Sequence, residues 1–293
     1  MTQISVRSLC KEYDDKCILE NVNVELPDHE FCMVLGPSGA GKSTFLRILL
    51  SMEEPTRGKV LIDGEPIDAE PQPDRGVVFQ RYSVFPHMTA LQNVMIGPQL
   101  RDGNWFTRLG GAKKKELRER ALALLGEVGL GDAGDKFPSQ LSGGMQQRLA
   151  IAQALIMEPK VLLLDEPFGA LDISTKRSMH QLILDLWERN KMTIVMVTHD
   201  IQEAFTLGTR ILMVDKKRDD PHAPDAFGST ITSDLRLDPS RRPPLAVVDD
   251  EAQDSDDAGS MREIFARWTR DAADAIVSTG GADNEPSDKR QAG

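Results

Sequence analysis

The chain lacks any apolar run long enough to cross a lipid bilayer. Its longest largely apolar segments, residues 161–164 and 193–197, have only the length of single strands. A membrane-spanning helix needs about 20 consecutive apolar residues. The first residues, from Met1 to Ile4, also lack a basic stretch followed by an apolar one. We therefore expect neither a membrane-spanning segment nor an export signal.

Patterns typical of disulfides or transition-metal sites are also absent. The cysteines are three, unevenly spaced and without a Cys-x-x-Cys pair: Cys10, Cys17 and Cys32. We expect them to be reduced thiols. Four histidines show no metal-ligand spacing and are expected at surface or packing positions: His29, His87, His180 and His222.

Positive charge is scarce as well. The 293 residues contain 35 Lys and Arg against 46 Asp and Glu, which gives a formal net charge of −11. This balance argues against a nucleic-acid-binding protein that depends on a basic surface. A local basic cluster at residues 113–120 is expected to be the solvated face of a helix, with a lipid-headgroup or partner contact as the alternative.

What the chain does contain is a phosphate-binding pattern. Residues 36–43 read G-P-S-G-A-G-K-S, between the apolar run 31–35 and a helical pattern that begins at Thr44. Glycines leave backbone N–H groups free to point at an anion, and the following helix directs its positive dipole end to the same place. Lys42 supplies a charge for the β and γ phosphates, and the Ser43 hydroxyl suits Mg²⁺. The predicted nucleotide-binding residues are Gly36, Pro37, Ser38, Gly39, Ala40, Gly41, Lys42, Ser43 and Thr44.

A second pattern supplies the carboxylates that such a site needs. The apolar strand 161–164 leads directly into Asp165 and Glu166. Asp165 is expected to meet the phosphate site and to coordinate Mg²⁺ together with Ser43. Glu166 points in a different direction and can align and deprotonate the attacking water.

The order of the predicted elements indicates the fold class. Strands are expected at residues 4–9, 19–26, 31–35, 58–62, 76–79, 161–164, 193–197 and 210–214, and a strand pair near 228–234. Helices are expected at 44–50, around 117–128, at 143–157, after an Asp172 N-cap, and at 201–206. Alternating strands and helices predict an α/β fold with a mostly parallel core sheet, an N-terminal antiparallel β subdomain and an inserted helical subdomain at about 91–157.

The C-terminal part differs in composition. Residues 240–293 carry 12 acidic and 7 basic residues, and six of the acidic ones fall within 248–259. We expect a nucleotide-binding α/β domain at 1–236, an acidic linker at 237–260, an amphipathic helix at 261–277 and a disordered end.

Residues 141–148, L-S-G-G-M-Q-Q-R, give the chain its resemblance to the ATP-binding subunits of ABC transporters. Ser142, Gly143 and Gly144 open the helix 143–157 and form a second anion site. Because the chain has one phosphate loop and one such signature, the resemblance implies a head-to-tail pair with two ATP molecules at the interface. Met145 departs from the family pattern, in which Gln is common.

The resemblance extends to further positions. Gln80 resembles the glutamine that reaches Mg²⁺ and the attacking water, and His199 resembles the switch histidine that contacts the γ-phosphate. Residues 169–172 resemble the loop that crosses the dimer interface. Tyr13 stands where the family places an aromatic ring against adenine. The implied catalytic residues are thus Glu166, His199 and Gln80, and the implied metal ligands are Ser43, Gln80 and Asp165.

The resemblance also implies partners and a location. Residues 80–94 are similar to the segment that docks a helix of the membrane permease in bacterial importers. The resemblance implies that the ATPase subunits form a homodimer or a pair of homologous subunits. Permease subunits would hold this pair at the cytoplasmic face of the membrane. A periplasmic or lipid-anchored solute-binding protein would act indirectly, and no nucleic acid is involved.

The solute is left open among several classes. The chain looks most like the nitrate, sulfonate and taurine importer group. Urea- or guanidine-like compounds, bicarbonate and amino acids are alternatives, and a non-transport cytosolic ABC ATPase is the least favoured reading.

Overall fold

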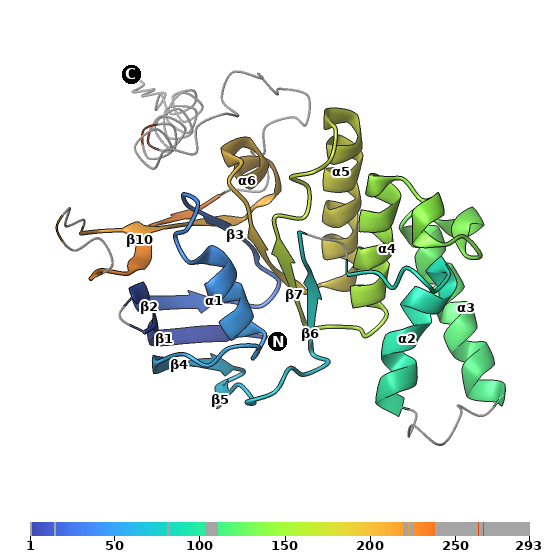
Figure 1. Cartoon of the computed structure of the whole chain (residues 1–293), viewed down its shortest axis with the longest axis horizontal. Helices are drawn as coiled ribbons and strands as arrows, with labels where there is room; N and C mark the ends of the chain where they lie inside the picture. The colour runs from blue at the N-terminus through green and yellow to red at the C-terminus, as the bar shows by residue number, and fades with distance from the viewer. Residues whose placement is uncertain are drawn as a thin grey trace, which may run out of the picture.

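One continuous mixed sheet runs through the molecule. The computed structural model describes residues 2–14, 16–80, 83–102, 111–218, 222, 226–237, 263 and 266. Within these residues, ten strands lie in the order β5-β4-β1-β2-β10-β9-β3-β8-β7-β6 (Figure 1). The strands are β1 (Ile4–Tyr13), β2 (Lys16–Leu26), β3 (Phe31–Leu35), β4 (Arg57–Ile62), β5 (Glu65–Pro66), β6 (Arg75–Val78), β7 (Val161–Asp165), β8 (Thr193–Val197), β9 (Arg210–Lys216) and β10 (Ser229–Arg236).

Helices cover both faces of the parallel half of this sheet, which comprises β9, β3, β8, β7 and β6. The helices are α1 (Lys42–Leu49), α2 (Ala90–Asp102), α3 (Gly111–Glu127), α4 (Gly143–Leu155), α5 (Ile173–Asn190) and α6 (Ile201–Leu207), with short 3₁₀ turns at Gly131–Ala133 and Pro138–Gln140. On β3, Met33 packs into the core formed with α4 and α5, whereas its neighbour Val34 packs into the core formed with α1. This two-sided burial explains why β3 and β8 are buried along their whole length.

The antiparallel half consists of β5, β4, β1 and β2. The strand pair expected near 228–234 is instead the single strand β10, which pairs with β9 in antiparallel fashion and touches β2 through Ser229 and Leu19. The expected pair is wrong because residues 228–234 hold only one strand, whose antiparallel partner is the preceding strand β9. β10 therefore joins the two halves into one sheet.

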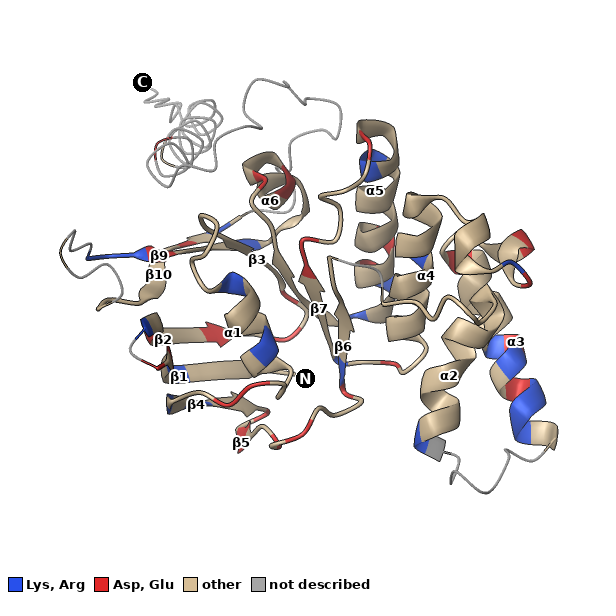
Figure 2. Ribbon diagram, viewed as in Figure 1, with Lys and Arg blue, Asp and Glu red and all other residues tan. Residues whose placement is uncertain are grey.

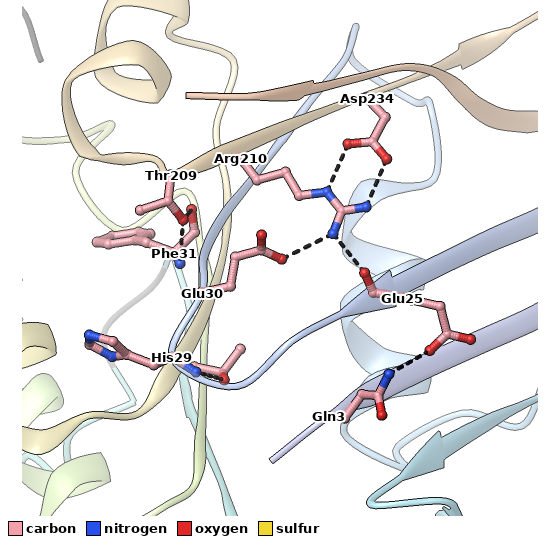
Figure 3. Close-up of polar contacts among 9 residues, drawn as sticks. Gln3, Glu25, His29, Glu30, Phe31, Thr209, Arg210 and Asp234 are labelled. Atoms are coloured by element: carbon pink, nitrogen blue, oxygen red, sulfur yellow. Dashed lines mark hydrogen bonds and ion pairs between the residues drawn. The ribbon is translucent and has the colours of Figure 1, made fainter. Parts of the chain in front are cut away.

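An ion-pair network centred on the buried Arg210 fixes β10 in this position (Figure 3). The Arg210 guanidinium donates to both oxygens of Asp234 at 2.7 Å, to the Glu25 carbonyl oxygen at 2.6 Å and to Glu30 Oε2 at 3.1 Å. Arg210 belongs to β9, Asp234 to β10, and Glu30 immediately precedes β3. The network thus links the strand that joins the two halves to the centre of the sheet.

The helix-rich segment expected at 91–157 contains α2, α3 and α4, which gather at one end of the molecule (Figure 1). Lys113, Lys114 and Lys115 are exposed on α3, as expected for a solvated basic face (Figure 2). Most of the predicted linker 237–260 and helix 261–277 lies outside the described residues, although Glu263 and Ala266 are helical. Among the described residues, no helix is long and apolar enough to span a membrane.

Candidate nucleotide-binding site

The predicted site residues follow four neighbouring parallel strands at the same sheet edge. Residues 36–43 follow β3, Thr198 and His199 follow β8, Glu166 follows β7, and Gln80 lies just beyond β6. The strands are in register: Val34 and Asp165 both pair with Val197. Ligands of open α/β sheets bind at the carboxyl ends of the strands, so the fold brings these loops to one place.

The loop 36–43 has the backbone that a phosphate-binding loop requires. Gly39 and Gly41 have φ of 78° and 83°, in the left-handed region that favours glycine. A Cβ on Gly36 would lie 2.1 Å from the Val214 carbonyl oxygen, because the loop begins in close contact with β9. Lys42 is 6% exposed and donates to the carbonyl oxygens of Gly36 at 2.7 Å and Pro37 at 2.9 Å. These bonds hold the ammonium group at the loop.

Ser43 and Asp165 meet beside the loop. The Ser43 hydroxyl donates to Asp165 Oδ1 at 3.1 Å. Burial raises the pKa of the Asp165 carboxyl above its ordinary value. A hydroxyl and a carboxylate are the oxygen ligands that suit Mg²⁺, which usually takes its remaining ligands from phosphate and water. Within the described residues, no group of three or more His, Cys, Asp and Glu could hold a metal ion.

Glu166 and His199 face each other across β7 and β8. His199 Nδ1 lies 3.3 Å from Glu166 Oε2. This hydrogen bond lowers the pKa of Glu166 and raises the pKa of His199. Glu166 has a φ of 44°, which few non-glycine residues adopt and which is common at functional sites. The pair therefore combines an ionised carboxylate with a hydrogen-bonding imidazole.

Gln80 and Tyr13 lie at the margins of this arrangement. Gln80 is exposed directly after β6. The Tyr13 hydroxyl donates to Glu53, and Lys11 Nζ lies over the ring at 4.8 Å from its centroid. A base that stacks on Tyr13 would therefore share the ring with Lys11 or displace it.

The three signature residues begin α4, which packs on the sheet face opposite to α1. Ser142 Oγ accepts a hydrogen bond from Met145 N at 3.3 Å and caps the helix, and both Ser142 and Gly143 are exposed. Gly144 is buried, and a Cβ there would lie 2.4 Å from Thr175 Cγ2 on α5. Close helix packing is thus a second reason for glycine at this position, which the sequence pattern did not reveal.

The sequence analysis also missed a buried polar cluster behind His199, formed by His180, Thr198 and Glu203. His180 was expected only at a surface or packing position. His180 lies on α5 and Glu203 on α6, so the sequence alone does not show that they are in contact. The spacing of Asp200 and Glu203 is a local signal, because Asp200 caps α6 and accepts from Glu203 N at 3.0 Å.

Known proteins identify the class of this chain. Residues 19–169 match the family described as ABC transporter. The nitrate import ATP-binding protein NrtD of Synechocystis sp. is 44% identical over 199 residues, which are 68% of this chain and 71% of that protein. The bicarbonate transport ATP-binding protein CmpD of the same organism is 45% identical over 208 residues, or 70% and 69% of the two chains.

Solved structures agree with this result. Two dimeric structures of the ATP-binding cassette MJ0796, one of them bound to ADP and Pi, are 33% and 34% identical to this chain, with TM-scores of 0.63 and 0.65. Each comparison covers 80% of this chain and 99% of the other. The chain belongs to the ABC transporter family. It is an ATP-binding subunit with the ABC ATPase fold, and it couples ATP hydrolysis to transport.

Proposed function

We propose that this subunit energises a bacterial importer for a small solute of the nitrate, sulfonate or taurine type. The observation that carries this proposal is the 44% identity to a nitrate import ATP-binding protein over 71% of its length. Bicarbonate is supported as an alternative by the 45% identity to CmpD. Urea- or guanidine-like solutes and amino acids remain further alternatives, and a non-transport cytosolic ATPase is the least favoured.

The solute is tested with the complete transporter. The chain is purified with its permease, reconstituted in vesicles, and its ATPase rate is measured with the solute-binding protein and nitrate, taurine, bicarbonate or spermidine. The proposal predicts stimulation by nitrate or an alkyl sulfonate. Stimulation by spermidine alone would overturn it. Spermidine is included because a relative named for spermidine/putrescine import, PotA of Pasteurella multocida, is 42% identical over 215 residues.

The site residues are assigned roles from their geometry. Lys42 and the backbone N–H groups of residues 36–44, except Pro37, hold the phosphates, and Tyr13 stacks on the adenine. Ser43, Asp165 and Gln80 are the candidate Mg²⁺ ligands, and bound Mg²⁺ would neutralise charge on the β and γ phosphates. The 3.1 Å contact between Ser43 and Asp165 supports this assignment.

Hydrolysis is assigned to Glu166 and His199. With a lowered pKa, Glu166 stays ionised at neutral pH and can orient and deprotonate the attacking water. His199 holds that carboxylate through Nδ1, with its raised pKa favouring the protonated ring. A protonated imidazole can also donate to the γ-phosphate as negative charge develops there.

The signature residues are assigned to a partner's site. We propose a head-to-tail pair, either of two copies or of homologous subunits, in which Ser142, Gly143 and Gly144 face the phosphates of the other chain. The exposed N-terminus of α4 supports this, as do the dimers of the MJ0796 cassette. Closure around two ATP molecules would drive the permease between its two access states.

The permease is proposed to dock at residues 80–94, on the cytoplasmic face of the membrane. A groove of about 260 Å³ between β6 and α4 lies next to this segment, which contributes Ser83 to its lining. Its lining is mostly apolar and includes Phe79, Ser83, Ala150, Ala154 and Met157. An amphipathic helix of the permease is the occupant that fits this chemistry. The solute-binding protein would act only through the permease.

We propose that the ATPase domain comprises residues 1–236. β10 ends at Arg236, and Leu237 N still donates to the Thr209 carbonyl oxygen at 2.8 Å. The helical subdomain at about 91–157, the acidic linker 237–260 and the segment 261–293 complete the proposed organisation.

A further inference from the structure

A buried polar cluster lies directly behind His199. The Glu203 carboxylate on α6 uses both oxygens: Oε1 lies 2.8 Å from His180 Nε2, and Oε2 accepts from Thr198 Oγ1 at 2.5 Å. His180, Thr198 and Glu203 are 7%, 2% and 4% exposed. A buried carboxylate with one donor on each oxygen is well satisfied, so removal of either donor is costly.

The cluster fixes the backbone on both sides of His199. Thr198 Oγ1 also accepts from Asp200 N at 3.1 Å, so one hydroxyl spans the histidine. The Asp200 carboxylate pairs with Lys176 Nζ at 3.0 Å. The segment 198–200 is thereby tied to α5 through Lys176 and, by way of Glu203, through His180.

His180 also touches the segment that carries Glu166. Its ring meets Phe168 edge-on, with centroids 5.3 Å apart, and Phe168 is 1% exposed two residues after Glu166. One imidazole on α5 therefore contacts the segment of Glu166 directly and the segment of His199 through Glu203. With Glu203 ionised, His180 Nε2 is the donor of their shared hydrogen bond.

We propose that His180 is a positioning residue for ATP hydrolysis, which acts through Glu203 and Thr198 to hold His199 against Glu166. This inference rests on the proposed role of His199. Without the Nε2–H donor, Oε1 of the buried Glu203 loses its partner, so the carboxylate is free to shift and Thr198 loses its fixed acceptor. A displacement of about 1 Å at a reacting group can cost on the order of a hundredfold in rate.

The test compares two substitutions at this position. In glutamine, as in histidine, Nε2 is three bonds from Cβ, so H180Q keeps the donor, whereas H180L removes it at similar size. H180L is expected to lower kcat by about tenfold or more while the KM for ATP stays within about twofold. H180Q is expected to restore kcat to within about threefold of the wild type. A general packing role would not separate these two variants by kcat alone.

A double-mutant cycle with H199A shows whether the effect passes through His199. The inference predicts that H180L and T198V each lower kcat in the wild-type background and cause little further loss in the H199A background, measured in single turnover. Thermal unfolding identifies a misfolded variant, and T198V carries the test if H180L is unstable.

The outcomes separate the two hypotheses. If H199A alone keeps wild-type kcat, the proposed role of His199 is wrong. If H199A lowers kcat but folded H180L and T198V do not, or if they lower it by the same factor in both backgrounds, only the role of His180 is overturned.

Discussion

Among single residues, Glu166 combines an uncommon backbone conformation with a specific partner. Its φ of 44° turns the chain sharply after β7, and Glu166 N donates to the Val197 carbonyl oxygen at 3.0 Å. This turn lets the neighbouring Asp165 face Ser43 while Glu166 faces His199. Adjacent residues can thus serve different tasks because the backbone separates their directions.

Replacing Glu166 with glutamine tests the proposed base. The E166Q variant keeps side-chain size but has no carboxylate to accept a proton, so the rate of hydrolysis should fall about a hundredfold or more. ATP binding should persist, and the closed dimer should accumulate with ATP but not with ADP. Nucleotide binding, turnover and size-exclusion chromatography measure these effects. Wild-type turnover in a folded E166Q protein would remove Glu166 from this role.

Arg210 and Asp234 make stability depend on pH. Hydrogen bonding from Arg210 lowers the pKa of Asp234, whereas burial raises the pKa of Glu30. A lowered pKa means that Asp234 stabilises the fold above its unfolded pKa of about 3.9 and loses that contribution as pH falls through the folded pKa. Glu30 acts in the opposite direction, since its raised pKa favours the fold in its protonated form.

The D234N variant isolates the acid-sensitive contribution. The wild type should lose more stability than D234N between about pH 5 and pH 3, because only the wild type loses the Asp234 carboxylate to protonation. Urea unfolding at the two pH values measures the difference. Equal acid sensitivity of D234N and the wild type would contradict the role of the Arg210–Asp234 pair.

At neutral pH, R210M should be destabilised by about 3 kcal/mol or more in urea unfolding, since it leaves Glu30 buried without its cation.

At the level of elements, the crossing of α4 and α5 constrains the signature. Gly144 and Thr175 pack so closely that a Cβ at residue 144 would lie 2.4 Å from Thr175 Cγ2. Arg148 strengthens this junction, since it donates to the Val128 carbonyl oxygen at 2.9 Å and to Ser178 Oγ at 2.5 Å. The start of α4 is therefore held rigidly against α5.

A compensating pair of substitutions tests this packing. G144A should destabilise the protein by about 1–3 kcal/mol, because the new methyl group forces α4 away from α5. T175S removes Cγ2 and should recover most of that loss in the double variant, while T175S alone should cost much less than G144A. Thermal unfolding of the four proteins provides the measurement. Equal stability of G144A and the double variant would show that the clash does not determine the loss.

The extent to which elements could be predicted depends on how local their determinants are. The strands β3 and β8 consist almost entirely of apolar residues, and their predicted bounds match the structure. Asp172 was correctly expected as an N-cap and accepts from Thr175 N at 3.0 Å. The sequence predicted a strand near 228–234 but not its pairing with β9. The contact between His180 and Glu203 joins two different helices, so periodicity and spacing could not reveal it.

At the scale of the whole molecule, the two halves of the proposed ATP site belong to elements on opposite faces of the sheet. The phosphate loop precedes α1 on one face, and the signature residues precede α4, which packs on the other. A head-to-tail pair would unite the loop of one chain with the signature of its partner. The proposed ATP site is therefore composed of residues from two chains.

Mixing two inactive variants tests the composite site most directly. K42A disables the phosphate loop, and G143D places a negative charge at the exposed start of α4, where it suits the helix but repels phosphate. Each variant alone should be inactive. A mixed dimer has one site that carries both substitutions and one site that is intact. Random mixing makes about half of the dimers mixed, so it should restore up to about a quarter of the wild-type ATPase rate. No recovery, when both variants are folded and the mixed dimer forms, would contradict a site shared between two chains.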